Sequence, residues 1–140
     1  MYVTVRWNPL DNEGTHPLWS ANCGLYAYVG HRSEVLYIGK VDGCTVRERW
    51  NRSGKEAFWD DLERERRIFK HAVIFGDIEL DVGSRLTREL LADIESLLIS
   101  ELQPWGNVQS CNTRIARSGL HVACAGSWPL RKRQFYDNGR

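Results

Sequence analysis

Residues 24–40 have the sequence GLYAYVGHRSEVLYIGK. It contains two short runs rich in aromatic and β-branched side chains, residues 24–29 and 35–38, which are typical of β-strands. The polar segment 30–34 between them is typical of a hairpin loop. We therefore expect two adjacent antiparallel strands, with the tyrosines of the two runs on neighbouring strands.

Hydrophobic spacing outside this hairpin predicts further strands and helices. The expected elements are a leading strand at 1–6, a helix from Val46 capped by Thr45, a helix at 56–70, a strand at 71–80, a helix at 84–102 and a strand at 121–124. Strands and helices mixed in this order predict an α+β fold. We expect a small antiparallel β-sheet flanked by helices, with a β-β-α-(α)-β-α core, an N-terminal strand and a C-terminal extension.

The positive charge of the chain is concentrated near its C-terminus. The net charge is only +1, yet residues 102–140 contain six Lys or Arg against one acidic residue. Within this segment Arg131, Lys132 and Arg133 lie close to Trp128 and to the aromatic pair at 135–136. Basic residues interleaved with aromatic ones favour contacts with a nucleic-acid backbone and its bases. A packed C-terminal segment with a charged turn is an equally open interpretation.

The cysteine pattern and the hydropathy exclude several protein classes. Cys23, Cys44, Cys111 and Cys124 form no C-x-x-C pair, so we expect neither a structural zinc site nor disulfides. No apolar run approaches the roughly 18 residues that a membrane span needs. We therefore expect a soluble, cytoplasmic protein with no membrane partner.

One carboxylate of the predicted 84–102 helix is a candidate functional group. At 100° per residue, the apolar residues at 91, 98, 99 and 102 lie within about 60° of Glu95. A carboxylate in the centre of an apolar patch needs a cation, a metal or a proton to offset its burial. Glu95 is therefore a candidate metal ligand, and a plain salt bridge is the alternative.

Cations follow the predicted hairpin closely. Tyr26 and Tyr37 lie on its two strands, Lys40 follows the second strand, and Arg47 and Arg49 lie at the start of the next predicted helix. Two hydroxyls beside several cations, with a carboxylate across the core, suit phosphate chemistry, because the cations neutralise phosphate oxygens and the carboxylate holds a metal. Cross-strand packing of the tyrosines is the structural alternative.

These motifs resemble those of a known nuclease family. Gly24-Leu25-Tyr26 and Tyr37-Ile38-Gly39 resemble the paired motifs that name the GIY-YIG nucleases, with Leu in place of Ile in the first. Lys40, directly after the second motif, is similar to the residue found in the repair-endonuclease branch. The resemblance covers about residues 22–110, which implies a nuclease core there and a C-terminal extension at 111–140 within one domain, 1–140.

The resemblance also implies roles for residues further along the chain. Arg49 is similar to the family's helix arginine if the preceding loop holds a two-residue insertion, whereas an ungapped alignment selects Arg47 instead. Glu95 matches the family's single metal-binding glutamate. Asn107, the last residue of a Pro-x-x-Asn run, matches the asparagine that closes the site.

One position departs from the family pattern. Where the family has His or Tyr four residues after the helix arginine, this chain has Ser53. Either Ser53 leaves that role unfilled, or another side chain replaces it. His31 and His71 are the candidates for such a replacement, and each is also consistent with an ordinary surface or strand histidine.

The function that the resemblance implies is metal-dependent endonuclease activity. One Mg²⁺ or Mn²⁺ ion on Glu95 is expected to assist hydrolysis of phosphodiester bonds in nucleic acid, with DNA favoured, by an activated water. Tyr26 or Tyr37 is expected to act as general base; Tyr26 is favoured, with Tyr37 positioning the water, and the sequence leaves the choice between them open. A monomer and a homodimer are both consistent with the sequence, as is a protein partner.

Two other functional hypotheses are consistent with the sequence. The first is a catalytically weak or inactive module of the same fold that binds nucleic acid or a protein in a regulatory or counter-defence role. The second is a purely structural protein whose Tyr and Glu residues belong to the core. That second reading predicts that Tyr26, Tyr37, Arg49, Glu95 and Asn107 lie scattered in space.

Overall fold

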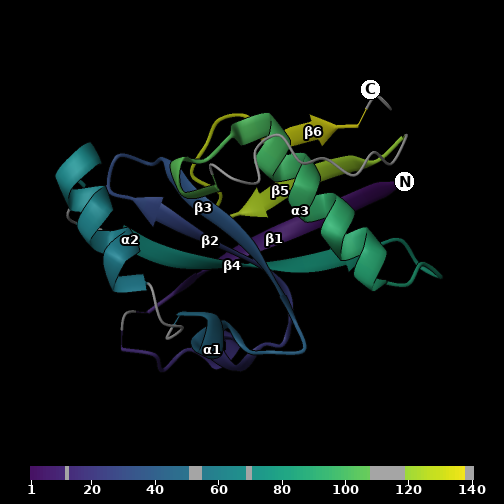
Figure 1. Cartoon of the computed structure of the whole chain (residues 1–140). Coiled ribbons are helices and arrows are strands. Elements are labelled where there is room, and N and C mark those ends of the chain that lie inside the picture. The colour runs from purple at the N-terminus through teal and green to yellow at the C-terminus, as the bar shows by residue number, and fades with distance from the viewer. Residues whose placement is uncertain (12, 51–54, 69–70, 108–118, 138–140) are drawn as a thin grey trace.

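The computed structural model describes residues 1–11, 13–50, 55–68, 71–107 and 119–137. Within them the chain forms a six-stranded sheet, three α-helices and shorter helical turns (Figure 1). The strands are β1 (Tyr2–Leu10), β2 (Cys23–Gly30), β3 (Val35–Asp42), β4 (His71–Leu80), β5 (His121–Gly126) and β6 (Gln134–Tyr136). The helical elements are η1 (Pro17–Ser20), α1 (Val46–Trp50), α2 (Lys55–Asp61), η2 (Leu62–Arg66), α3 (Arg88–Leu102) and η3 (Trp105–Asn107). The expected α+β architecture is confirmed at this level.

The sheet is mixed, which corrects the expectation of a purely antiparallel one. Its strand order is β3-β2-β4-β1-β5-β6, and β1 pairs with β5 in parallel while the other neighbours are antiparallel. β5 enters beside β1 only after α3 has carried the chain across the sheet. A strand placed by a long crossover is free of the antiparallel direction that a tight hairpin imposes. β3 and β6 are the two edges.

Side chains of β2 and β4 alternate between two hydrophobic clusters, because successive residues of a strand face opposite sides of a sheet. Leu25, Ala27 and Ile74 belong to a largely aliphatic cluster with the buried leucines of α3. Tyr26 and Tyr28 belong to a second cluster that contains Val46 of α1 and Leu62 of η2, together with several partly buried aromatic side chains. In Figure 1, α3 lies at the right and α1 and α2 lie at the bottom and left.

The hairpin and the start of α1 form as the sequence predicts. The amide of Gly30 donates to the carbonyl of Glu34 at 3.0 Å, which closes the β2–β3 loop. The amide of Glu48 donates to the Thr45 hydroxyl at 3.1 Å, so Thr45 caps α1. The first hydrogen bond fixes the loop that leads into β3, and the second fixes the first turn of α1.

Three expected boundaries differ from the structure. The helix expected at 56–70 gives way at Leu62 to the π-helical turn η2, which ends where Arg67 adopts a left-handed φ of 56°; residues 69–70 lie outside the described residues. α3 begins at Arg88 rather than at 84, because the Thr87 hydroxyl accepts from the Leu90 amide at 3.0 Å. β1 continues to Leu10, beyond the expected 1–6.

The C-terminal segment completes the sheet. β5 extends to Gly126, two residues past the expected strand, and β6 was not predicted at all. β6 has only three residues, and its Phe135 is buried in the aliphatic cluster. Such a short strand leaves too few positions for an alternation of apolar and polar side chains to stand out. Among the described residues, no helix combines the length and the apolar character that crossing a bilayer requires.

Candidate functional site

Six of the side chains singled out in the sequence line one cleft of about 220 Å³ at the β3 edge of the sheet. They come from five elements that are distant along the chain. The residues are Tyr26 of β2, Tyr37 and Lys40 of β3, Arg49 of α1, Glu95 of α3 and Asn107 of η3, with Ile38, Gly39 and Ile99 completing the wall. A purely structural role predicts that these residues lie scattered in space. The six residues instead lie together in one cleft.

Gly39 explains how Tyr26 reaches this edge. Tyr26 and Gly39 are paired across β2 and β3. A Cβ atom at position 39 would lie 2.5 Å from Cζ of Tyr26 and 2.6 Å from its hydroxyl oxygen, closer than nonbonded atoms tolerate. Because glycine has no side chain, the ring of Tyr26 lies directly over β3. The glycine of the Tyr37-Ile38-Gly39 motif is thus a packing requirement of the cleft.

The two tyrosines of the cleft differ in environment. Their ring centroids are 5.9 Å apart, and their side chains are hydrogen-bonded to each other. Tyr26 is only 3% exposed, whereas Tyr37 is partly exposed. Burial raises the pKa of Tyr26 well above that of a free phenol, the neighbouring Tyr37 and Tyr28 add to the increase, and Arg49 opposes it. Tyr26 therefore holds its proton more tightly than an ordinary tyrosine.

The structure separates the two arginines of α1. Nε of Arg49 donates to Sγ of Cys44 at 3.1 Å, and the side chain of Arg49 lines the cleft. Arg47 is exposed, donates to the carbonyl of Gly14 at 2.8 Å and lies over the Trp19 ring. Residues two apart on a helix point in different directions. Arg49 is therefore the cleft arginine, and Arg47 binds the loop before β2.

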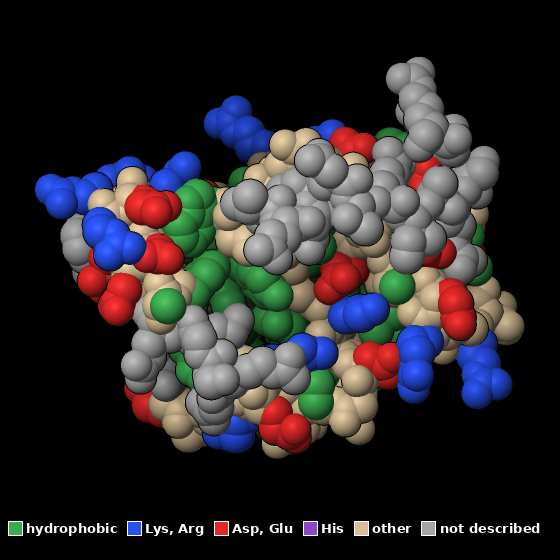
Figure 2. Space-filling view, viewed as in Figure 1, with side chains coloured by type: hydrophobic (Ala, Val, Ile, Leu, Met, Phe, Trp, Pro, Cys, Tyr) green, Lys and Arg blue, Asp and Glu red, His purple; other side chains and the backbone are tan. Residues whose placement is uncertain are grey.

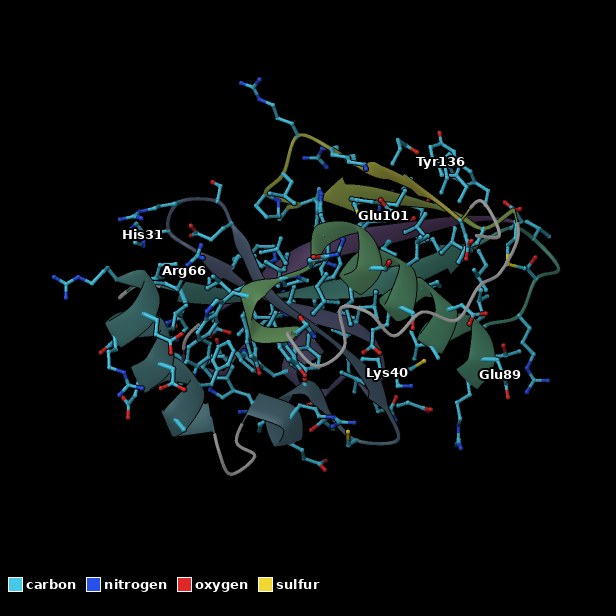
Figure 3. The ribbon with its side chains drawn as sticks, turned by 45° about the horizontal axis from the view of Figure 1, so that its top comes forward. His31, Lys40, Arg66, Glu89, Glu101 and Tyr136 are labelled. Carbon is cyan, nitrogen blue, oxygen red and sulfur yellow. The ribbon has the colours of Figure 1, made fainter. Side chains whose placement is uncertain are left out.

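Glu95 lies in the cleft between two cations. Burial raises the pKa of Glu95, while the charges of Lys40 and Arg49 and the donated backbone N–H of Lys40 oppose that increase. Figure 3 shows Lys40 beside α3, the helix that contains Glu95. The carboxylate is partly exposed, so it is accessible from the cleft.

Asn107 closes the cleft by pairing with the edge strand. Its Oδ1 accepts from the amide of Ile38 at 2.8 Å, and its Nδ2 donates to the carbonyl of the same residue at 2.9 Å. The side-chain amide thus takes the place of the next strand and satisfies both backbone groups of Ile38. Asn107 is 5% exposed, so these hydrogen bonds are buried.

The donor set of the cleft fits one divalent ion of the Mg²⁺ class. Among the described residues, no three His, Cys, Asp or Glu side chains form a cluster that would bind a metal by themselves. Mg²⁺ is commonly held by one or two carboxylates, with water and substrate phosphate as its other ligands. A single partly exposed carboxylate, Glu95, in a cleft with room for solvent meets that requirement.

The reserve residues lie elsewhere. His31 and His71 line a different pocket of about 180 Å³ at the hairpin end of β2 and β3. His71 stacks on Trp59 with ring centroids 3.7 Å apart, and in Figure 3 His31 lies far from Lys40. Neither histidine lines the cleft that holds the six predicted residues. Ser53 lies outside the described residues.

The basic run near the C-terminus is at the β6 edge, opposite the cleft. Nη1 and Nη2 of Arg133 donate to the carbonyls of Cys124 and Trp128, each at 3.1 Å. Nζ of Lys132 lies 3.7 Å from a carboxylate oxygen of Glu101, and Arg131 is exposed. Arg133 thus holds the β5–β6 connection together, which favours the packed-segment interpretation for that residue.

Two features of the cleft were not predicted from the sequence. Cys44 contacts Arg49, although the cysteine pattern gave it no role, and Gly39 is required sterically rather than for a turn. The hydrogen bond joins Cys44, just before α1, to Arg49 within it, and such a contact leaves no periodic pattern in the sequence. No protein-family model, curated protein or solved structure matches this chain.

Proposed function

We propose that this chain is a divalent-metal-dependent nuclease of the GIY-YIG type that hydrolyses phosphodiester bonds in DNA with an activated water. The observation that carries the proposal is the convergence of Tyr26, Tyr37, Lys40, Arg49, Glu95 and Asn107 on one cleft. Motif order and spacing in the sequence point to these six residues, and one cleft brings them together. The cleft combines phenols, cations and one carboxylate, which is the chemistry that phosphoryl transfer needs.

Lys40 and Arg49 bind the phosphate in this proposal. A guanidinium offers paired N–H donors that match two non-bridging oxygens of a phosphodiester. The attacked phosphate gains negative charge in the transition state, so a fixed cation stabilises that state more than the ground state. The contact with Cys44 holds Arg49 in place before the substrate arrives.

Glu95 would hold the divalent ion. When bound, Mg²⁺ or Mn²⁺ supplies Lewis acidity that stabilises the charge developing on the leaving 3′ oxygen. Asn107 fixes β3 through Ile38, and the backbone N–H of Lys40 in the same strand donates to the Glu95 carboxylate. The carboxylate is thus oriented by the edge strand that also supplies Tyr37 and Lys40.

Tyr26 and Tyr37 position and activate the attacking water. Burial of Tyr26 supports the reverse of the assignment expected from the sequence: Tyr37 faces the water, and Tyr26 beneath it orients the Tyr37 hydroxyl. A base takes up a proton from the attacking water, so cleavage is expected to accelerate as the pH rises above neutral.

One observation favours the alternative of a weak or inactive binding module. Tyr26, the base favoured from the sequence, is buried and its pKa is raised. No histidine lines the cleft among the described residues. With Tyr26 unsuited to act as base and no histidine in the described part of the cleft, water activation depends on Tyr37 and the bound metal ion. The alternative predicts metal-independent binding of DNA or protein with no strand scission.

The experiment that separates the two functions uses labelled duplex, single-stranded and flap DNA, with and without Mg²⁺ or Mn²⁺. The proposed function predicts scission only with the metal, and its loss in both Glu95→Ala and Tyr37→Phe with folding retained. Arg47→Ala is the matched control, because Arg47 contacts the Gly14 loop and not the cleft. Full activity in Glu95→Ala would remove the assigned role of Glu95.

A further inference from the structure

A group of aromatic side chains extends from the cleft across the same face of the molecule. Its members are Tyr37 of β3, Trp50 of α1, Phe58 and Trp59 of α2 and Trp105 of η3, here termed the aromatic platform. Each of the five is only partly buried. Figure 2 shows a hydrophobic hollow in the middle of this face. Large aromatic rings left partly open to solvent in this way are suited to contact a ligand.

The platform is continuous with the cleft. Tyr37 belongs to both, its ring centroid lies 6.1 Å from that of Phe58, and Phe58 lies 5.4 Å from Trp105. A Cβ atom at Gly106 would lie 2.5 Å from the Phe58 ring, so this glycine permits the close approach. Gly106 directly precedes Asn107. A polymer whose phosphate occupies the cleft would therefore place its neighbouring groups on these rings.

We infer that the chain acts on unpaired DNA, and that bases flanking the phosphate in the cleft stack on the aromatic platform. This inference rests on the proposed phosphodiester chemistry of the same cleft. Cations that bind a backbone beside aromatic rings that stack bases are the combination found in single-strand binding grooves. The bases of an intact duplex stack on one another and offer no open face at such a surface.

Charge distinguishes DNA from an apolar peptide as the occupant. Lys40 and Arg49 line the cleft at the border of the platform, and they complement a phosphate backbone. Glu95 balances only one of these two positive charges, so a hydrophobic peptide would leave the cleft with an unmatched positive charge. A single DNA strand satisfies the rings and the cations together, because it alternates flat apolar groups with negative charges.

The test measures binding of fluorescein-labelled oligothymidylate and of a matched duplex by fluorescence anisotropy, without divalent ions. Wild type is compared with Phe58→Leu and Trp105→Leu, which remove a ring but keep apolar bulk. Stacking on one ring contributes enough that each variant is expected to lose roughly five- to 150-fold in single-strand affinity. Trp105→Phe keeps a ring and is expected to restore most of it.

Tyr136→Leu is the matched control, since Tyr136 is 55% exposed and lies on β6, away from the platform. It is expected to bind as wild type does. Thermal unfolding of every variant identifies loss of fold, and the Phe variant separates ring loss from misfolding. Tighter binding of the duplex than of the single strand, or wild-type affinity in both Leu variants, would overturn the inference.

The same variants separate this inference from the proposed function. If wild type binds single strands through the platform but cuts no DNA with Mg²⁺ or Mn²⁺, the platform stands and the nuclease proposal fails. If wild type cuts duplex DNA and both Leu variants cut it equally well, the nuclease stands and the platform fails.

Discussion

The two edges of the sheet both carry basic side chains and use them differently. At the β3 edge, Lys40 and Arg49 line a cleft that also holds the partly exposed carboxylate of Glu95. At the β6 edge, Arg133 is bound to backbone carbonyls and Lys132 lies beside Glu101. Arg133, one member of the run that is conspicuous in the sequence, thus has a structural role. The cations that are dispersed along the chain converge where chemistry is proposed.

The largest expected effect is at the β3 edge. Arg49→Ala removes the charge that we propose stabilises the transition state, so it is expected to lower the cleavage rate by about 10²–10³-fold. Arg47→Ala, two residues away, is expected to cut at a rate close to wild type, because Arg47 contacts Gly14 and Trp19. Single-turnover rates on labelled DNA measure both. Equal losses in the two variants would contradict the assignment of the cleft arginine.

Asn107→Ala tests whether the edge strand positions the cleft. The change leaves the buried amide and carbonyl of Ile38 without partners, so the free energy of unfolding is expected to fall by about 2–4 kcal/mol. Chemical denaturation measures the loss. Asn107→Asp retains only the acceptor and places a charge against the Ile38 carbonyl, so it is expected to be at least as destabilising. A neutral effect of both variants would show that β3 is held by other contacts.

Gly39→Ala tests the packing of Tyr26 over β3. The added Cβ meets the Tyr26 ring, and such overpacking typically costs about 1–3 kcal/mol of unfolding free energy. Cleavage is expected to slow as well, because Tyr26 is displaced. In the double variant Tyr26→Leu/Gly39→Ala the second change should cost clearly less than it does alone. Strict additivity would show that the clash is relieved elsewhere.

Glu95→Gln is expected to stabilise the protein while inactivating it. Because burial raises the pKa of Glu95, the folded chain binds that proton more tightly than the unfolded chain does. The stability linked to this proton is present at low pH and is lost as the pH rises through the folded-state pKa. At pH 7 the neutral amide is expected to raise the unfolding free energy, because it removes the cost of burying the charge. Below pH 4 the difference should vanish; a constant difference would contradict the burial effect.

The smallest effect is expected at the β6 edge. Arg131 is exposed and lies opposite the cleft, so Arg131→Ala should leave the cleavage rate unchanged. Its effect on the slope of log affinity against log salt should not exceed about 1, the value for one phosphate contact. Lys40→Ala should lower both the slope and the rate. A rate loss in Arg131→Ala equal to that in Arg49→Ala would erase the distinction between the edges.

Local signals predicted the elements around the cleft well. The hairpin of β2 and β3, the Thr45 cap and the strand at His71–Leu80 follow from turn residues, a hydroxyl cap and strand-forming residues, which act over a few neighbouring positions. Glu95 was found because helix geometry relates it to its apolar neighbours. Motif order then selected Tyr26, Tyr37, Lys40 and Asn107, all of which line the cleft.

What the sequence did not reveal depends on long-range packing. The parallel pairing of β1 with β5 is determined by where α3 crosses the sheet, and no local pattern encodes it. The choice between Arg47 and Arg49 depends on the direction in which a five-residue helix presents its side chains. The binding of Arg133 to backbone carbonyls depends on the β5–β6 turn. Each of these three features depends on tertiary packing, which the sequence around the residues does not encode.

We expect the cleft at the β3 edge to bind a catalytic divalent ion through Glu95. Anomalous diffraction from crystals soaked in Mn²⁺ locates that ion, with Glu95→Gln crystals as the matched control. We predict a manganese peak about 2.1 Å from a Glu95 carboxylate oxygen, as for Mg²⁺–oxygen contacts, and its absence in the variant. A wild-type peak elsewhere with none at Glu95, or an unchanged peak in Glu95→Gln, would contradict the account.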